Sequence, residues 1–183
     1  MKINENMKAA DSCKIQVLIE ENGVPTREDL NQIVMIAHLT EPMQDKLSQI
    51  IDVLKFDKDE ILFKEGERAE RFYMLRSGNV LLEQSISDKV TACVGSVKPG
   101  FSFGWSAMVE NGIYTNQAVC TEPSEIYSFK REKINRLLEQ DPEMGFRMYQ
   151  RLLEIIKKRL DYRTVQFRQA IKNHPDLQNL FRM

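Results

Sequence analysis

Residues 63–80 read FKEGERAERFYMLRSGNV, and residues 97–104 read VKPGFSFG. In both segments short apolar runs are separated by glycine, which is typical of strands joined by tight turns. Glycine is favoured in such turns because it adopts positive φ angles without a steric penalty. The first segment predicts a strand, a glycine turn, a second strand and a second glycine turn.

The same pattern extends through the middle of the chain from Lys55 onward. Apolar runs of four to six residues alternate with turn residues in four segments, which are residues 59–67, 71–84, 89–104 and 116–129. Strands this short and this closely spaced favour an antiparallel sandwich or barrel of roughly eight strands.

Two short helices are predicted before the strands. The first begins at Thr26, an N-cap with Asp29 three residues later, and the second begins at Thr40 with Pro42 in its first turn. Their apolar stripes are Leu30, Ile33, Val34 and Ala37 in the first, and Leu47, Ile50, Ile51 and Leu54 in the second.

Two more helices are predicted after the strands. One covers residues 130–140, and the other begins at the N-cap Asp141 and runs from Glu143 to about Asn173. Apolar residues in the long helix follow a 3-4-3-4 spacing that Arg163 interrupts; they are Phe146, Tyr149, Leu153, Ile156, Leu160 and Phe167.

The long helix has two interpretations. It packs its stripe on the strands of its own chain, or it pairs with a second copy. Its length of roughly 45 Å exceeds what a small barrel can cover, and Leu152 and Ile155 widen its apolar face. We therefore expect a homodimer through this helix.

Composition limits the functional class and the location. The chain has 183 residues with 26 basic and 27 acidic side chains, a balance that argues against nucleic-acid binding. It has no apolar run near the roughly 20 residues of a membrane span, and its N-terminus lacks a signal-peptide pattern. We expect a cytoplasmic protein that binds neither nucleic acid nor membrane.

No residue cluster predicts a metal site or a catalytic centre. Cys13, Cys93 and Cys120 are far apart and form no CxxC pair, so they are interpreted as reduced thiols, and His38 and His174 form no cluster. Motifs of hydrolases and of P-loop proteins are absent from the sequence. The chain is expected not to be an enzyme.

The motifs quoted above, in this order and spacing, resemble the cyclic-nucleotide-binding domain of the catabolite activator protein, protein kinase A regulatory subunits and nucleotide-gated channels. The resemblance covers about residues 39–161. It implies a mainly β fold with flanking helices: an eight-stranded, jelly-roll-like double-stranded β-helix, or β-roll, with N-terminal helices and a long C-terminal helix. The expected organisation is a polar arm at 1–25, the β-roll with its helices at 26–140, and a dimerisation helix and tail at 141–183.

The resemblance also implies a ligand site, the phosphate-binding cassette. In the family, amides of a short helix and an arginine bind the cyclic phosphate, and a glutamate after the glycine binds the ribose. The cassette maps to residues 103–118, with its short helix at about 106–109. Its expected ligand-binding positions are Phe103, Gly104, Trp105, Ser106, Ala107, Met108, Tyr114, Thr115 and Asn116.

Two cassette positions differ from the family pattern. Trp105 stands where the ribose glutamate is usual, and Tyr114, or else Ile113, stands at the place of the phosphate arginine. The sequence has no arginine or lysine between Gly100 and Lys130. These changes argue against ordinary recognition of cyclic AMP or cyclic GMP.

Three interpretations of the pocket remain open. Trp105 and Tyr114 fill it, or it binds a flatter and less anionic ligand between them. Alternatively, a cyclic nucleotide binds through the amides of residues 106–108, helped by Arg159 or Arg163. We expect a regulatory or sensor module that signals through a separate effector protein, because ten residues after the helix cannot hold a helix-turn-helix module; the alternative is a non-sensing interaction domain with a pocket filled by Trp105.

Overall fold

The computed structural model describes residues 25–87 and 90–174. It divides into two compact units between Leu137 and Leu138. The predicted polar arm at 1–25 lies outside the described residues except for Pro25, as does Cys13.

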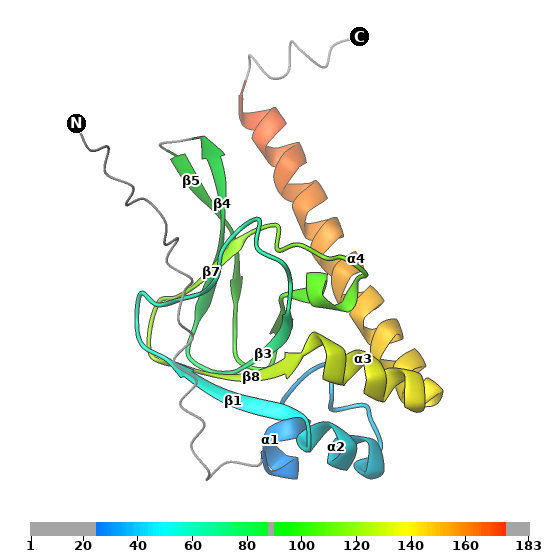
Figure 1. The fold of residues 1–183 in the computed structure, drawn as a ribbon. Coiled ribbons are helices and arrows are strands. Elements are labelled where there is room, and N and C mark those ends of the chain that lie inside the picture. Colours follow the sequence, from blue (N-terminus) through cyan, green and yellow to red (C-terminus); the bar gives the residue numbers. More distant parts are fainter. Residues whose placement is uncertain (1–24, 88–89, 175–183) are drawn as a thin grey trace, which may run out of the picture. The chain divides into compact units, whose positions relative to one another are not determined.

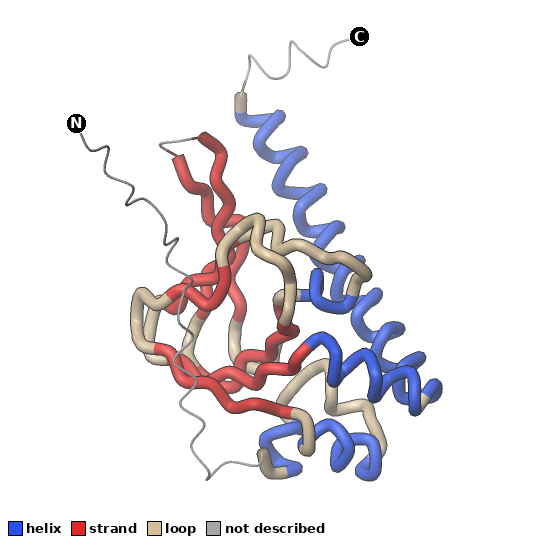
Figure 2. Tube along the Cα trace, viewed as in Figure 1, coloured by secondary structure: helices blue, strands red, loops and turns tan. Residues whose placement is uncertain are grey.

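The first unit contains eight strands in two antiparallel sheets (Figures 1 and 2). One sheet has the order β1-β8-β3-β6 and the other the order β2-β7-β4-β5. The strands are β1 (Ile51–Phe56), β2 (Ile61–Phe63), β3 (Arg71–Ser77), β4 (Val80–Ser87), β5 (Val90–Val97), β6 (Ser102–Phe103), β7 (Gln117–Cys120) and β8 (Ser124–Lys130). The predicted eight-stranded β-roll is confirmed.

Two N-terminal helices precede the strands, α1 (Arg27–Asn31) and α2 (Glu41–Ser48). Thr26 and Asp29 form the predicted capping box of α1. Both helices are shorter than predicted, because turns follow Asn31 and because β1 begins at Ile51. The helical stripe predicted for Ile51 and Leu54 is wrong, because both residues lie in β1 and pair with Phe129 and Ile126 of β8.

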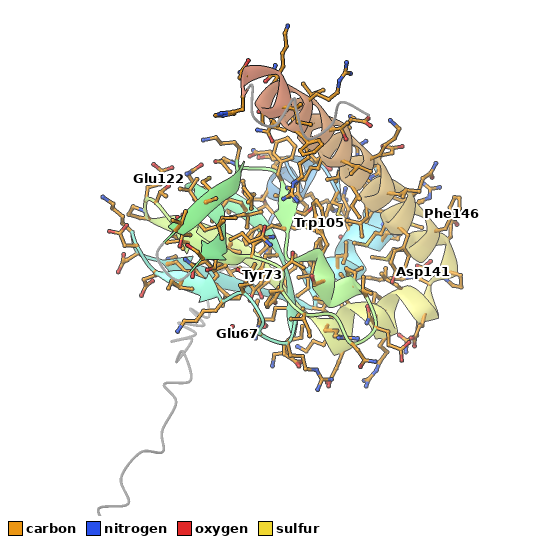
Figure 3. The ribbon with its side chains drawn as sticks, turned by 90° about the horizontal axis from the view of Figure 1, so that it is seen from above. Glu67, Tyr73, Trp105, Glu122, Asp141 and Phe146 are labelled. Carbon is orange, nitrogen blue, oxygen red and sulfur yellow. The ribbon has the colours of Figure 1, made fainter. Side chains whose placement is uncertain are left out.

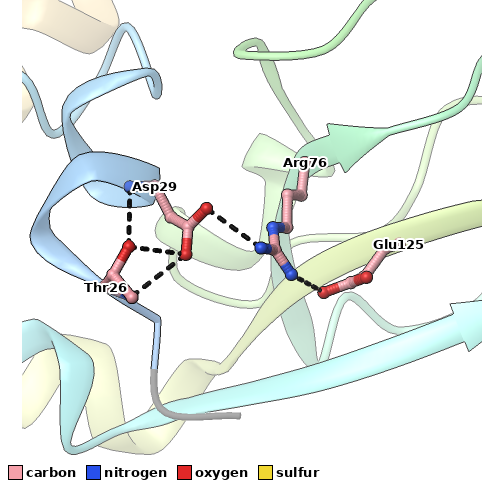
Figure 4. Close-up of polar contacts among 4 residues, drawn as sticks. All are labelled: Thr26, Asp29, Arg76 and Glu125. Atoms are coloured by element: carbon pink, nitrogen blue, oxygen red, sulfur yellow. Dashed lines mark hydrogen bonds and ion pairs between the residues drawn. The ribbon is translucent and has the colours of Figure 1, made fainter.

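A charged network connects α1 to β3 and β8 (Figure 4). Arg76 of β3 donates to Asp29 at 3.0 Å and also pairs with Glu125 of β8. Burial would raise the pKa of Asp29, but hydrogen bonds from Thr26 and Arg76 outweigh this effect and hold the pKa below its usual value. Asp29 thus serves both as a helix cap and as an ionic partner.

The chain after the strands forms the helices α3 (Arg131–Gln140) and α4 (Pro142–Asn173). Asp141 caps α4 by accepting a hydrogen bond from the Met144 amide, and Pro142 stands in the first turn, as predicted. Gly145 allows α4 to approach the end of α3 closely, since a Cβ there would lie 3.0 Å from the Leu138 carbonyl oxygen.

Helix α4 has two apolar faces. Met144, Met148, Leu152 and Ile155 are buried. The predicted stripe lies on another side of the helix, and each of its side chains is between 38% and 68% exposed. The prediction that Leu152 and Ile155 widen the stripe is therefore wrong, because both belong to the buried face. We call the exposed side chains the exposed stripe; they are Phe146, Tyr149, Leu153, Ile156, Leu160 and Phe167.

Candidate functional site

The cassette predicted from the sequence begins where β6 ends. Gly104 has a left-handed φ of 70°, and a Cβ at this position would lie 2.9 Å from the Tyr73 ring. Only glycine fits both the backbone angle and the close approach of the ring. The next residues form a short 3₁₀ helix, η1 (Trp105–Met108), one residue earlier than the predicted helix at 106–109.

Trp105 begins this short helix and is half-buried (Figure 3). Its indole Nε1 donates a hydrogen bond of 3.3 Å to the hydroxyl of Ser102 in β6. The Ser102 hydroxyl is itself buried and lies 3.4 Å from the sulfur of Met35. The polar edge of the indole is therefore engaged by a residue three positions earlier.

Tyr114, at the place of the family arginine, is 4% exposed. Its hydroxyl donates a hydrogen bond of 2.6 Å to the carbonyl oxygen of Arg71 and accepts one of 3.2 Å from the Arg71 amide. Its ring stacks on Phe63 with 3.8 Å between the centroids. The side chain is thus fixed by both its ring and its hydroxyl.

Four aromatic rings gather at this place: those of Phe63, Tyr73, Phe103 and Tyr114. The Phe63 and Tyr73 centroids are 5.6 Å apart, and those of Tyr73 and Phe103 are 5.3 Å apart. Burial raises the pKa of both Tyr73 and Tyr114, so both phenols are neutral at pH 7. A cluster of neutral rings offers packing surface and no positive charge to a phosphate.

Backbone hydrogen bonds hold the end of the cassette against the turn between β2 and β3. The Tyr114 amide donates to the Glu67 carbonyl, and the Tyr114 carbonyl accepts from the Gly66 amide, both at 2.9 Å. The Ala69 amide donates to the Gly112 carbonyl at 2.9 Å. The position of Tyr114 is therefore fixed by its main chain as well.

The remaining predicted site residues lie in different environments. Ala107 and Met108 are buried, and the Ala107 amide donates to the Gly104 carbonyl at 3.1 Å, so this amide is used inside the turn. Ser106 is half-buried. Thr115 is exposed and accepts a hydrogen bond from the Asn116 side chain.

Arg159 and Arg163 belong to α4 in the second unit. The cassette belongs to the first unit, so a contact between either arginine and the cassette stays a prediction.

The sequence interpretation missed Arg71, whose backbone holds the Tyr114 hydroxyl. The Arg71 guanidinium pairs with Asp52 of β1 at 2.7 Å and donates to the Ser128 hydroxyl of β8 at 2.8 Å. Its contacts join three strands, and its partners are 19, 43 and 57 residues away along the chain. Because such separations leave no local pattern, no sequence signal identifies this residue.

Residues 25–87 and 90–174 contain no group of three or more histidine, cysteine or acidic side chains that could hold a metal ion. No helix in the described part of the chain is long and apolar enough to cross a membrane.

Comparisons with known proteins agree with this fold. The family model of the cyclic nucleotide-binding domain matches residues 53–141 of the sequence. Cyclic GMP-binding protein C of Dictyostelium discoideum is 25% identical over 112 residues, which are 57% of this chain and 4% of that protein. The cGMP-dependent protein kinase egl-4 of Caenorhabditis briggsae is 24% identical over 111 residues, 60% of this chain and 15% of that protein. The chain thus spans a small fraction of the length of these relatives.

Solved structures give the same result. A Geobacter metallireducens structure aligns with a TM-score of 0.65 at 25% identity, covering 74% of this chain and 98% of the other. The catabolite activator protein of Thermus thermophilus aligns with a TM-score of 0.64 at 18% identity, and the alignment covers 75% of this chain and 62% of that protein's chain. At 18% identity, the similarity to the Thermus thermophilus protein shows a shared fold alone.

Proposed function

The chain belongs to the cyclic nucleotide-binding domain family, related to the catabolite activator protein and to kinase regulatory domains, and from this premise we propose a regulatory module without arginine-based recognition of a cyclic phosphate. The module acts through a separate partner protein, and its role does not include catalysis. The copies pair through α4. We propose a cytoplasmic location from the reduced state expected of its cysteines.

The packing of Tyr114 carries this proposal. An arginine–phosphate pair is a charge-assisted interaction that contributes about 1.5–3 kcal/mol. Its loss weakens a phosphate ligand by roughly 10- to 100-fold, at about 1.4 kcal/mol per tenfold. Tyr114 does not replace this interaction, because its hydroxyl already bonds to Arg71 and its ring stacks on Phe63.

A second candidate is a module that senses a flat, weakly charged ligand. The half-buried indole of Trp105 at the start of η1 favours it, since an aromatic face binds such ligands by stacking. The stretch between Gly100 and Lys130, which has no basic residue, would also accept a neutral ligand more readily than an anion.

A ligand panel tests both candidates. Cyclic AMP, cyclic GMP and flat aromatic metabolites are titrated into the purified protein by calorimetry, with the melting temperature as a second measurement. We expect no binding of the two cyclic nucleotides at micromolar concentration. A melting shift with an aromatic metabolite that is lost in Trp105→Ala supports the second candidate.

A paired variant makes the test sharper. Tyr114→Arg together with Trp105→Glu restores both family side chains, and we expect this variant to gain cyclic nucleotide binding. Cyclic AMP binding by the unaltered protein with micromolar affinity contradicts the proposal. If that binding persists in Tyr114→Ala but is lost in Arg163→Ala, the α4 arginine contributes to the site.

A further inference from the structure

Charge is distributed unevenly along α4. Residues 142–156 contain two acidic and two basic side chains and are neutral overall. Residues 157–173 contain six basic side chains and one acidic side chain, a net charge of +5. The exposed stripe runs through both halves, so its C-terminal half lies in a strongly basic stretch.

The basic side chains border the C-terminal half of the exposed stripe on both sides. At 100° per residue, Arg163 lies along one border. Lys157 and Arg168 lie along the other together with Asp161, which pairs with Lys157 at 2.7 Å, so this border keeps one net positive charge. Leu160, 63% exposed, stands between the two borders. An apolar strip with positive borders fits a partner surface that is apolar at its centre and acidic at its edges.

A second copy does not fit this half of the helix. In a parallel pair, equivalent heptad positions face each other, so Arg163 would face Arg163 of the other copy. Positive charge already acts within one chain: burial is the larger cause that lowers the pKa of Arg159 to about 10, and the charge of Arg163 lowers it further. Two such segments side by side would repel each other.

The shape of the stripe favours a helical partner over a membrane surface. Its positions form a narrow seam, and in the C-terminal half Leu160 and Phe167 stand one heptad apart with Arg163 between them, whereas a membrane-bound helix has a wider apolar face. Tyr162 and Val165 are exposed on other sides of α4, so the remaining surface is not uniformly polar. A narrow seam at heptad spacing is the geometry that a second helix recognises.

We propose that the C-terminal half of α4, residues 157–173, binds an acidic helix of a partner protein, with Leu160 in the apolar seam and Arg163 against a carboxylate. This inference deepens the proposed function by giving the chemistry of the partner, and it rests on that function only in requiring a partner protein. The neutral half, up to Ile156, is left for the second copy.

The test uses the full chain and a designed probe. A fluorescently labelled peptide of about four heptads carries leucine at positions a and d and glutamate at e and g. A control peptide carries lysine at e and g. We expect fluorescence anisotropy to show binding of the glutamate peptide at least about tenfold tighter than that of the lysine peptide.

Matched variants separate a specific seam from diffuse attraction. Arg163→Glu and Lys158→Glu change the net charge equally, but Lys158 lies about 140° around the helix from Arg163. We expect Arg163→Glu and Leu160→Asp each to weaken binding by about tenfold or more, and Lys158→Glu by less than about threefold. Equal losses in Arg163→Glu and Lys158→Glu overturn the proposal, because the attraction would then be diffuse.

Two further outcomes would overturn the proposal of an acidic partner helix and indicate that something else covers residues 157–173. Binding to phosphatidylserine vesicles that is lost in Leu160→Asp indicates a membrane surface. A dimer that becomes a monomer in Leu160→Asp indicates that a second copy covers this half. The peptide and vesicle experiments do not depend on the cassette. Cyclic AMP binding by the unaltered protein would therefore contradict the proposed function without contradicting the partner helix.

Discussion

The hydroxyl of Tyr114 donates a 2.6 Å hydrogen bond to the carbonyl oxygen of Arg71, which lies 43 residues earlier in the chain. The same hydroxyl accepts from the Arg71 amide, and Arg71 is held by Asp52 and Ser128 through its side chain. The residue at the arginine position of the cassette is therefore a structural link between the cassette and β3.

Tyr114→Phe removes this hydroxyl and keeps the ring stacked on Phe63. The Arg71 carbonyl and amide then lose a buried partner, so we expect the free energy of unfolding in urea to fall by about 1–3 kcal/mol. Tyr162→Phe is the control, because Tyr162 is exposed and its change should stay within about 0.5 kcal/mol. Equally small changes in the free energy of unfolding in the two variants would show that the Tyr114 hydroxyl does not stabilise the fold.

Asp29→Asn tests the network between α1 and the strands. The pKa of Asp29 is lowered in the folded protein, so its carboxylate stabilises the fold above the unfolded value of about 3.9, and this contribution is lost as the pH falls through the lower, folded value. We expect the variant to be less stable than the unaltered protein at pH 7 and the difference to shrink as the pH falls below the unfolded value of about 3.9.

Urea unfolding at several pH values measures this difference. Glu28→Gln, which removes the neighbouring exposed carboxylate, should change stability by less than about 0.5 kcal/mol. A difference between Asp29→Asn and the unaltered protein that stays constant from neutral to acid pH would contradict the assigned role.

The described cysteines should differ in reactivity. Burial raises the pKa of Cys120 to about 11, so about one thiol in a thousand is ionised at pH 8, whereas Cys93 is exposed. In a Cys13→Ser background, we expect a thiol reagent to label Cys93 in the folded protein and Cys120 only after denaturant is added. Rapid labelling of two thiols in the folded protein would contradict this assignment.

Tyr127 should make the fold sensitive to alkaline pH. Burial raises the pKa of Tyr127 to about 12. Its stabilising contribution is complete below the unfolded value of about 10 and is lost between about pH 10 and 12, by up to about 1.4 kcal/mol per pH unit. The stability of Tyr127→Phe should fall less steeply over this range.

At pH 7 the same variant should be as stable as the unaltered protein, or more stable. Among the described residues, the buried Tyr127 hydroxyl has no hydrogen-bond partner, so its removal leaves no group unpaired. A loss above about 1 kcal/mol at pH 7 would indicate that this hydroxyl is satisfied in solution.

Leu153→Asp tests pairing of the copies through the neutral half of α4. Leu153 is 67% exposed, and a carboxylate in an apolar seam would separate two copies. We expect light scattering to change from a dimer to a monomer of 21.4 kDa. Val165→Asp, on another side of the helix, should leave the dimer intact; a monomer in the unaltered protein at micromolar concentration would contradict the pairing.

The sequence by itself determined the order of the elements. Glycine after short apolar runs identified the strands, and local caps at Thr26 and Asp141 identified the helix starts, because these signals depend on neighbouring residues. Trp105 and Tyr114 were likewise found from the sequence as departures from the cassette pattern.

Tertiary structure alone decided which side chains meet. Ile51 became a strand residue because it pairs with Phe129 of β8, and the exposed stripe of α4 is distinct from its buried face. Arg71, 43 residues away in the chain, meets Tyr114 through hydrogen bonds between its backbone and the Tyr114 hydroxyl. Local sequence patterns do not encode such contacts, because they form only when segments distant in the chain come together in the folded protein.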